Sequence, residues 1–268
     1  MFHTIKNGTL EYLAADALSG SVHCFSTRLG GVSEGALASL NLGTHRGDKP
    51  ENVLENYRIL GRAVGFSPEQ TVFTHQEHTN IILRVGAADR GTGLFRPQET
   101  VCDGLITNEP GVALVCFSAD CTPVLLFDPV SRAVAAIHAG WRGTANGAVC
   151  KAVEAMEREF GARPEDIRAA IGPSIGQCCF ETDEDVPQAM LDAFGPEAGR
   201  FIEKRGEKYF VDNKALNRLW LTRAGLRQID VSPDCTMCRP DRFWSHRVTR
   251  GARGSLAGII MLREDCTP

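Results

Sequence analysis

The pattern of apolar and polar positions predicts a pair of buried strands near the middle of the chain. Apolar runs at residues 123–127 and 133–137 are separated by a turn-forming Asp-Pro pair at residues 128–129. Short apolar runs bounded by turn signals are typical of buried strands. If these strands pair antiparallel, Cys121 before the first and His138 after the second meet at one sheet edge. A thiolate and an imidazole there either bind a metal ion or act as a nucleophile and its base.

The rest of the pattern predicts an α+β fold. Apolar residues recur at helical spacing over residues 50–64, 147–160, 183–194 and 213–224, the last helix being capped by Asp212. Further strands are predicted within residues 72–85 and at 112–117, 167–171 and 258–262. Because strands and helices follow no regular βαβ rhythm, we expect α+β rather than a doubly wound sheet. No linker or internal repeat divides the chain, which predicts one domain over residues 1–268.

Candidate site residues gather after the predicted strand pair. Trp141 and Arg142 stand between two glycines that follow His138, ahead of a helix start. This arrangement indicates a backbone that approaches an anionic ligand closely. Asp120, next to Cys121, falls at the same predicted sheet edge. The crowding of these residues favours a functional site over an ordinary strand-turn-helix.

Polar residues in two earlier regions are open to a structural or a functional role. Arg28 precedes a Gly-Gly pair, and Asn41 and Arg46 stand in later loops, where polar residues can be simple turn formers. His75 and His78 lie three apart, so in an extended chain they face opposite sides. Only one of them is expected to point into a given site, and the residues alone do not say which.

Composition narrows the classes of partner. A formal net charge of -4 does not indicate the basic surface that nucleic-acid-binding proteins carry. We therefore do not expect nucleic acid as a partner. The chain has no apolar run long enough to span a bilayer, and its start lacks the features of a signal peptide. We therefore expect a cytoplasmic protein that does not associate with a membrane.

Ten cysteines are many for such a chain, and we expect most of them to be reduced thiols. Four fall inside apolar patterns typical of a core, at positions 24, 102, 116 and 150. Cys178, Cys179, Cys235 and Cys238 stand in predicted loops. A single CxxC supplies two ligands and no second pair has zinc-finger spacing, so the sequence gives little support for a structural zinc there.

Several motifs, in this order, resemble those of the bacterial YfiH family, also called the laccase-domain family. They are FSTRLGGVS, SLNLG, HQEH, DGLIT, SADCTPVLLFDP, AAIHAGWRG, IGPSIGQCCFE, CTMC and FWSHR, spread from about residue 25 to residue 260. The resemblance implies a single-domain, YfiH-like α+β sandwich with mixed sheets flanked by helices. It also implies one metal ion, usually zinc, held by two histidines and a cysteine. The family's Q-x-H-G motif falls on residues 76–79, which makes His78 the expected ligand beside Cys121 and His138.

The chain departs from the family pattern at two positions. Thr79 replaces the usual glycine, which would narrow the pocket, and Ser255 stands where an arginine is common, which removes an expected anion contact. Three protein ligands still leave the fourth position of a tetrahedral zinc open, which is typical of a catalytic site.

The resemblance implies a purine nucleoside phosphorylase. It would act on adenosine, inosine and S-methyl-5′-thioadenosine with phosphate, and would also deaminate adenosine. The expected catalytic residues are His78, Cys121, His138 and Asp120, with Asp120 moving protons. The expected substrate and phosphate contacts are Arg28, Asn41, Arg46, Arg142 and Arg247. The chain is expected to be a monomer or a small homo-oligomer.

Four other interpretations are also considered. The same ligand set suits copper, so Cu²⁺ stays open beside Zn²⁺; a laccase, however, needs roughly ten histidines, and the chain has seven. Cys121 and His138 could instead form a hydrolase of the peptidoglycan-editing amidase type, which needs a free thiolate. A binding protein with a structural metal is disfavoured by the open coordination site. A deaminase-like pairing of His75-x-Glu77 with Cys235 and Cys238 is disfavoured by Asp234, which breaks the motif.

Overall fold

The central strand hairpin forms where the sequence predicts it. The structure, a computed structural model, describes residues 1–264. In it, β8 (Thr122–Asp128) and β9 (Ala133–Ala139) pair antiparallel, with Pro123 opposite His138. Every residue of both strands is buried, in keeping with their nearly continuous apolar sequence. The hairpin therefore brings the end of β9 back beside Cys121.

Two six-stranded sheets contain most of the strands. The first has the order β1-β2-β3-β15-β7-β4, and the second β14-β10-β8-β9-β6-β5. The strands of the first sheet are β1 (Phe2–Asn7), β2 (Leu10–Ala15), β3 (Val22–Ser26), β15 (Leu256–Met261), β7 (Ala113–Ser118) and β4 (Thr71–Phe73). Those added to the hairpin in the second are β14 (Gln228–Val231), β10 (Arg168–Ile171), β6 (Gly104–Thr107) and β5 (Ile82–Arg84). Both sheets are mixed, because β4 pairs parallel with β7, β5 with β6, and β14 with β10.

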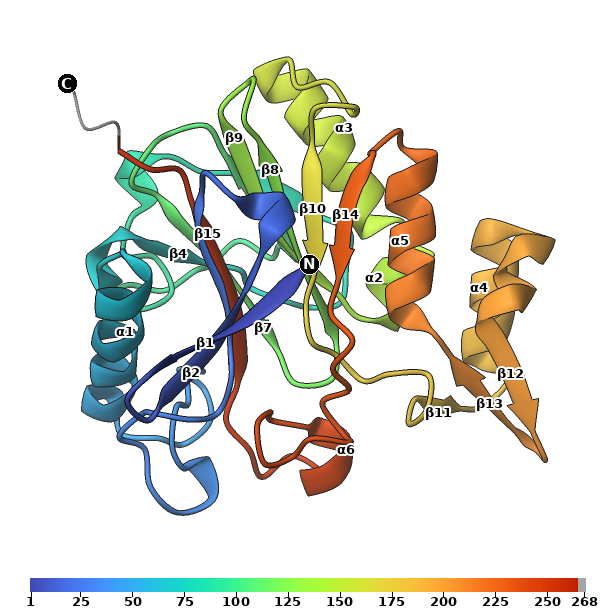
Figure 1. Cartoon of the computed structure of the whole chain (residues 1–268), viewed down its shortest axis with the longest axis horizontal. Helices are drawn as coiled ribbons and strands as arrows, with labels where there is room; N and C mark the ends of the chain where they lie inside the picture. The colour runs from blue at the N-terminus through green and yellow to red at the C-terminus, as the bar shows by residue number, and fades with distance from the viewer. Residues whose placement is uncertain (265–268) are drawn as a thin grey trace.

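The two sheets pack face to face, with a helix layer on each outer side (Figure 1). Their inner faces share one apolar cluster, which includes Leu114 and Ile260 of the first sheet and Leu125 of the second. Helix α1 (Pro50–Val64) covers the first sheet, while α3 (Ala148–Phe160) and α5 (Asn213–Arg223) cover the second. Burial on both faces fixes the register of the central strands and hence the position of the sheet edge.

A smaller unit lies to one side of the sandwich (Figure 1). It contains a three-stranded antiparallel sheet of β11 (Glu181–Thr182), β13 (Lys208–Val211) and β12 (Ile202–Arg205), together with α4 (Asp185–Phe194). Its apolar cluster is small and centres on Met190, Phe194 and Val211. The sequence pattern did not predict this sheet, because its strands are short and largely exposed.

Short helical segments complete the described chain. They are α2 (Trp141–Ala145), α6 (His246–Thr249) and 3-10 turns at Asp16–Leu18, Gly35–Leu37, Pro68–Gln70, Ala87–Asp89 and Pro196–Phe201. Helix α2 begins directly after Gly140, so the predicted glycine-bounded loop at Trp141 and Arg142 is a helical turn. The helix at 147–160 begins one residue later than predicted, after Gly147 in a left-handed conformation.

The predicted α+β class is confirmed, and the nine cysteines within residues 1–264 are all free thiols. No helix in that range is long and apolar enough to cross a bilayer. The cytoplasmic location stays a prediction. So does one domain over residues 1–268, whose last four residues lie outside the described part of the chain.

The N-cap of α5 generates a stability prediction. The carboxylate of Asp212 accepts a hydrogen bond from the amide of Ala215 at 3.0 Å, as the sequence predicted. We expect Asp212→Ala to lower the free energy of unfolding by about 1 kcal/mol in denaturant titration, whereas Asp212→Asn, which can still cap, retains most of it. Equal stability of the two variants would contradict this role.

Candidate functional site

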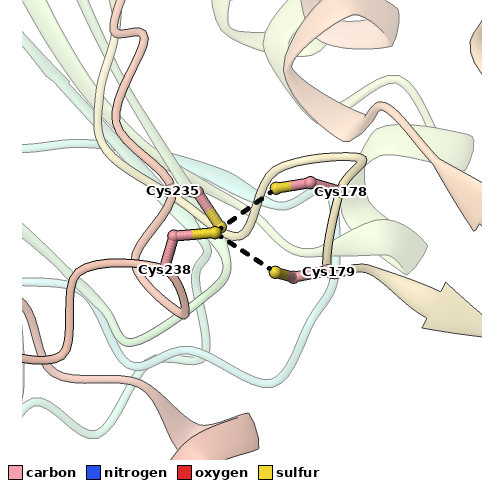
Figure 2. A group of neighbouring side chains, drawn as sticks. All are labelled: Cys178, Cys179, Cys235 and Cys238. Carbon is pink, nitrogen blue, oxygen red and sulfur yellow. Dashed lines mark hydrogen bonds between the residues drawn. The ribbon is translucent and has the colours of Figure 1, made fainter.

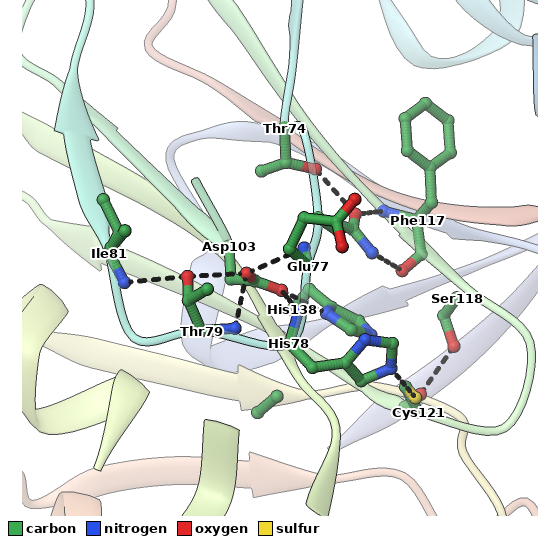
Figure 3. Close-up of polar contacts among 12 residues, drawn as sticks. Thr74, Glu77, His78, Thr79, Ile81, Asp103, Phe117, Ser118, Cys121 and His138 are labelled. Atoms are coloured by element: carbon green, nitrogen blue, oxygen red, sulfur yellow. Dashed lines mark hydrogen bonds and ion pairs between the residues drawn. The ribbon is translucent and has the colours of Figure 1, made fainter. Parts of the chain in front are cut away.

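Three side chains converge at the edge of the second sheet (Figure 3). Cys121 directly precedes β8, His138 is near the end of β9, and His78 comes from the loop between β4 and β5. Their sulfur and ring nitrogens all lie within 4.8 Å of one another, and the Cys121 Sγ is 3.8 Å from the His78 Nε2. His78 is 43 residues before Cys121 in sequence, yet all three donors face one point.

The loop that carries His78 is pinned to the neighbouring strand. The Oε1 of Gln76 accepts from the amide of Phe117 at 2.6 Å, and its Nε2 donates to the carbonyl of Phe117 at 3.0 Å. The side chain of Gln76 therefore acts as an extra backbone unit beside β7. His78 itself has a φ of 60°, which turns the chain between β4 and β5, so the rule for an extended chain does not decide how His75 and His78 face.

Asp103 orients the two histidines. Its fully buried carboxylate receives the Nδ1 of His138 at 2.7 Å and the amide of His78 at 3.1 Å. It also accepts from the amide of Thr79 at 2.7 Å and from its hydroxyl at 2.8 Å. Because the Nδ1 of His138 is engaged, its Nε2 is free to face Cys121. Sequence analysis did not single out Asp103, although this residue begins the DGLIT motif and directly precedes a buried strand.

Charge favours the thiolate form of Cys121. Burial alone would raise the pKa of this thiol, but the positive charge of His138 and hydrogen bonds from both histidines lower it to about 6. Burial likewise disfavours the imidazolium of His138, yet the Cys121 thiolate and Asp103 raise its pKa to about 9. A thiolate and two imidazoles form a donor set that suits zinc or copper. The site can therefore hold a metal ion.

A cavity of about 250 Å³ opens beside these donors. Its lining residues are His78, Ala119, Asp120, Cys121, Trp141, Ile175, Phe180, Asn213, His246, Arg247 and Arg253. Gly140 is needed next to it, because a Cβ there would lie 2.7 Å from the His78 Cδ2 and 3.2 Å from the Cys121 Sγ. The sequence motifs contain most of the lining, but Ile175, Phe180, Asn213, His246 and Arg253 were not named as site residues.

Asp120 lies in the cavity wall and ties down the C-terminal loop. Its carboxylate accepts from the Thr236 hydroxyl at 2.6 Å, the Ser245 hydroxyl at 3.0 Å and the Arg247 amide at 2.7 Å. The backbone at Asp120 has a φ of 88°. Through these contacts Asp120 positions the loop that carries Arg247. The role of Asp120 in moving protons stays a prediction.

Of the predicted arginines, one lines the cavity and a second lies near an arginine that does. Arg247 lines the cavity, with its Nη1 donating to the carbonyl of Glu181 at 3.0 Å. Arg46 donates to the Ser255 hydroxyl at 3.0 Å and lies near Arg253, whose pKa is lowered to about 10 by burial and by the charge of Arg46. Ser255, the departure from the family pattern, thus positions Arg46.

Like Arg46, the three remaining candidates are not among the residues that line the cavity. The guanidinium of Arg28 donates to the carbonyls of Ala38 and Pro240 and stacks on Trp244, with its Cζ 3.8 Å from the ring centroid. Asn41 is buried and bonds Gly43, Asp48 and Ser255. Arg142 is exposed, with its Cζ 4.2 Å from the Trp141 ring centroid.

The role of Asp103 generates a prediction on metal affinity. Asp103→Asn would place an amide donor against several backbone and ring donors, so His138 would lose its fixed orientation. We expect the dissociation constant for zinc at this site to rise roughly 10–100-fold, measured by competition with a chromophoric chelator. An unchanged affinity, with the fold intact by circular dichroism, would remove Asp103 from the support of the site.

Comparison with known proteins agrees with this architecture. The family model described as multi-copper polyphenol oxidoreductase laccase matches residues 22–263. The chain is 38% identical over 258 residues to a protein of Geobacillus stearothermophilus named purine nucleoside phosphorylase YlmD, covering 94% of each chain. It is 35% identical over 243 residues to purine nucleoside phosphorylase YfiH of Escherichia coli, covering 91% of this chain and 94% of the relative.

A solved structure has the same fold. The crystal structure of the Bacillus licheniformis hypothetical protein YfiH aligns with a TM-score of 0.91 at 34% identity, over 97% of this chain and 99% of that one. The family model and these relatives extend over nearly the whole chain. The resemblance carried by the sequence motifs is therefore confirmed: this chain belongs to the laccase-domain family that includes YfiH and YlmD.

Proposed function

We propose that this protein is a zinc-dependent purine nucleoside phosphorylase that acts on adenosine, inosine and S-methyl-5′-thioadenosine, with accompanying adenosine deaminase activity. The names of the similar proteins support the phosphorylase activity. The observation that carries the proposal is structural: three metal donors face one point at the wall of a cavity that also contains two arginines. A metal site beside a cationic pocket suits a reaction that joins phosphate to a nucleoside.

The donor set fits zinc by its chemistry. His78, Cys121 and His138 would hold the ion. Asp103 would orient His138 through the hydrogen bond to its Nδ1. A zinc ion with three protein ligands has a fourth position for substrate or water and acts as a Lewis acid there. The protein's own contribution is to hold the thiolate deprotonated and the ligands in place.

The cationic side of the cavity supports phosphate as the second substrate. The Nε of Arg253 is buried and has no hydrogen-bond partner among residues 1–264. Arg46 lies close enough to lower the pKa of Arg253, so two like charges share a poorly hydrated region. A bound dianion would neutralise this repulsion and accept charge-assisted hydrogen bonds from the guanidinium groups. Arg247, on the same cavity, can complete the anion site.

The apolar side of the cavity supports a purine nucleoside. Trp141, Ile175 and Phe180 supply apolar and aromatic surface against which a base can pack. The Oδ1 of Asn213 is buried without a hydrogen-bond partner in the described chain, while its Nδ2 donates to the Thr122 hydroxyl and the Ala139 carbonyl. That oxygen can accept a hydrogen bond from a ribose hydroxyl or a purine amine.

The proposed reaction follows from this arrangement. A phosphate oxygen attacks C1′ of the ribose, the glycosidic bond breaks, and the base leaves with a proton while ribose 1-phosphate forms. The arginines hold the phosphate and the apolar wall holds the base, so that the reacting atoms approach in a fixed orientation. Asp120 lines the cavity and is the candidate for proton transfer. Its carboxylate also accepts three hydrogen bonds, which fix its position.

A second candidate is favoured by one observation. Cys121, His138 and Asp103 form a chain of nucleophile, base and orienting carboxylate, which is the arrangement of a cysteine hydrolase. His78, however, approaches the same sulfur, and a hydrolase has no need of this second imidazole. A laccase is disfavoured, because His3 and His23 bond Asp16 and Ser21, do not line the cavity and belong to no group of metal donors in the described chain.

Replacement of Cys121 tests the metal and the reaction together. We expect the wild-type protein to release adenine and ribose 1-phosphate from adenosine only when phosphate is present, and to form some inosine. Cys121→Ala should lose about one equivalent of zinc and all nucleoside turnover, because two imidazoles alone bind zinc weakly. Cys150→Ala, on the outer helix α3, is the matched control and should keep both.

Two outcomes would oppose the proposal. Full turnover in Cys121→Ala would remove Cys121 from the reaction. A wild-type protein that holds no metal at this site, is inert to adenosine and is inactivated by alkylation of Cys121 would establish the cysteine hydrolase instead.

Replacement of Arg253 tests the anion site. Arg253→Ala should raise the KM for phosphate roughly 10–100-fold while the KM for adenosine changes little, since a hydrogen bond to a charged group is worth about 1.5–3 kcal/mol. Arg253→Lys should retain part of the effect of the charge, and Arg142→Ala, at an exposed position outside the cavity lining, should leave both constants unchanged. Steady-state kinetics at varied phosphate would detect this, and an unchanged phosphate KM would place the anion elsewhere.

A further inference from the structure

Four cysteines outside the candidate active site lie together (Figure 2). Cys178 and Cys179 belong to the loop between β10 and β11, and Cys235 and Cys238 to the loop after β14. The two pairs are about sixty residues apart in sequence. None of the four has a part in the proposed reaction. The sequence alone indicated one CxxC pair, whereas the fold brings four cysteines together.

The spacing of the sulfurs is that of a tetrahedral metal site. All four Sγ atoms lie within 4.8 Å of one another, and Cys238 is 3.6 Å from Cys178 and 3.4 Å from Cys179. A zinc ion with Zn–S bonds of about 2.3 Å requires sulfurs about 3.8 Å apart. The described cysteines form no disulfide, and these distances are far longer than a disulfide bond of about 2.05 Å.

The backbone around the sulfurs holds this arrangement. The amide of Gly176 donates to the Cys235 Sγ at 3.2 Å, the kind of contact that stabilises a thiolate ligand. The amides of Cys179 and Phe180 both donate to the carbonyl of Gly176 at 2.9 Å, which curls the loop and presents two adjacent cysteines. A Cβ at Gly176 would lie 3.3 Å from the Cys178 Sγ, so the glycine permits the close approach.

The two loops are also joined by backbone contacts beside the cluster. Ser174 and Cys235 form an isolated β-bridge, and the amide of Thr236 donates to the carbonyl of Ser174 at 3.1 Å. The positions of the four sulfurs thus follow from backbone pairing and do not depend on flexible side chains alone. Two of the thiols, those of Cys178 and Cys238, are exposed, so a metal ion can reach them from solvent.

We propose that Cys178, Cys179, Cys235 and Cys238 bind one zinc ion as a closed tetrathiolate site. Each cysteine binds as a thiolate, so its thiol proton passes to solvent and four Zn–S bonds replace the hydration of the ion. With four protein ligands no position is open for substrate, so the site is structural. Tetrahedral sulfur ligands select zinc or iron, and a free zinc ion needs neither assembly nor a redox partner.

The zinc site would fix two walls of the active-site cavity. Ile175 and Phe180 flank the first cysteine pair, and the amide of Ile175 donates to the carbonyl of Asp120 at 2.9 Å. Thr236, between Cys235 and Cys238, donates to the Asp120 carboxylate at 2.6 Å. A second cavity, of about 600 Å³, contains Cys178 and Cys179 and shares His246 and Arg247 with the first. The ion would therefore hold together two loops that both contact Asp120.

Metal stoichiometry in paired variants tests the proposal separately from the proposed reaction. The full-length protein, prepared under reducing conditions, should contain about two zinc ions per chain, one at each site. Cys235→Ser with Cys238→Ser should retain about one, and Cys121→Ala should also retain about one. The protein carrying all three substitutions should contain none. Cys150→Ala is the matched thiol control and should keep both.

Cobalt gives a readout that does not depend on activity. Co²⁺ added to metal-free Cys121→Ala should give strong thiolate-to-cobalt charge transfer and tetrahedral visible bands, and loading should end at one equivalent per chain. Cys121→Ala protein that also carries Cys235→Ser and Cys238→Ser should lose this spectrum. If it fails to fold, the single substitution Cys178→Ser, at an exposed position, should weaken cobalt binding at least tenfold while circular dichroism stays unchanged.

Three results would overturn the inference. Zinc content that is unchanged by Cys235→Ser with Cys238→Ser would show that the cluster holds no ion. A disulfide between the two loops in the reduced preparation, mapped by mass spectrometry, would assign the thiols another role. Iron in place of zinc at these cysteines would refute the choice of metal.

Discussion

The candidate active site depends on one buried carboxylate. Asp103 has no exposed surface and would be costly to bury as an anion, yet it receives hydrogen bonds from a histidine ring, a hydroxyl and several amides. Through them it holds the turn that carries His78 and the imidazole of His138. The amide of His138 also donates to the backbone carbonyl of Asp103 at 2.7 Å. Loss of that single group would release two of the three donors at once.

Asp120 performs a corresponding task in the wall of the cavity. Its carboxylate gathers the hydroxyls of Thr236 and Ser245 and the amide of Arg247, all from the C-terminal third of the chain. Asp120 also immediately precedes Cys121, so the candidate metal site and the loop that supplies Arg247 share one turn of backbone. The proposed metal and anion positions are thus coupled by two acidic residues, although neither acid contributes to the donor set itself.

The sequence predicted the parts of the fold that are locally specified. Residues 123–127 and 133–137 form buried strands because their apolar pattern and the Asp-Pro turn agree, and Asp212 caps α5 because its side chain acts within one turn. Nothing local indicates that Asp103 turns toward His138, since that contact needs β6 and β9 to pair. The proximity of Cys178 and Cys179 to Cys235 and Cys238 was not predicted for the same reason, because residues about sixty apart in sequence carry no spacing signal. His78 was chosen over His75 by family resemblance, and the positive φ of His78 shows why strand periodicity could not decide.

The location of the four cysteines follows from how unevenly the apolar core is distributed. The sandwich buries apolar residues on both faces of its central strands and needs no further cross-link. Residues 177–180 and 237–242 of the two loops are exposed or only partly buried, although Phe243 and Trp244 belong to the core, and the neighbouring small sheet is partly exposed. Yet these loops carry Phe180 and Thr236, whose positions define the cavity wall and the contacts of Asp120. Where burial cannot order a segment, coordination to a metal ion can, because a tetrahedral set of thiolates fixes the distance between two loops. The side chains of a functional site must stay within a fraction of an ångström of their productive positions. A metal constraint therefore helps most where the apolar core ends and packing no longer fixes the backbone.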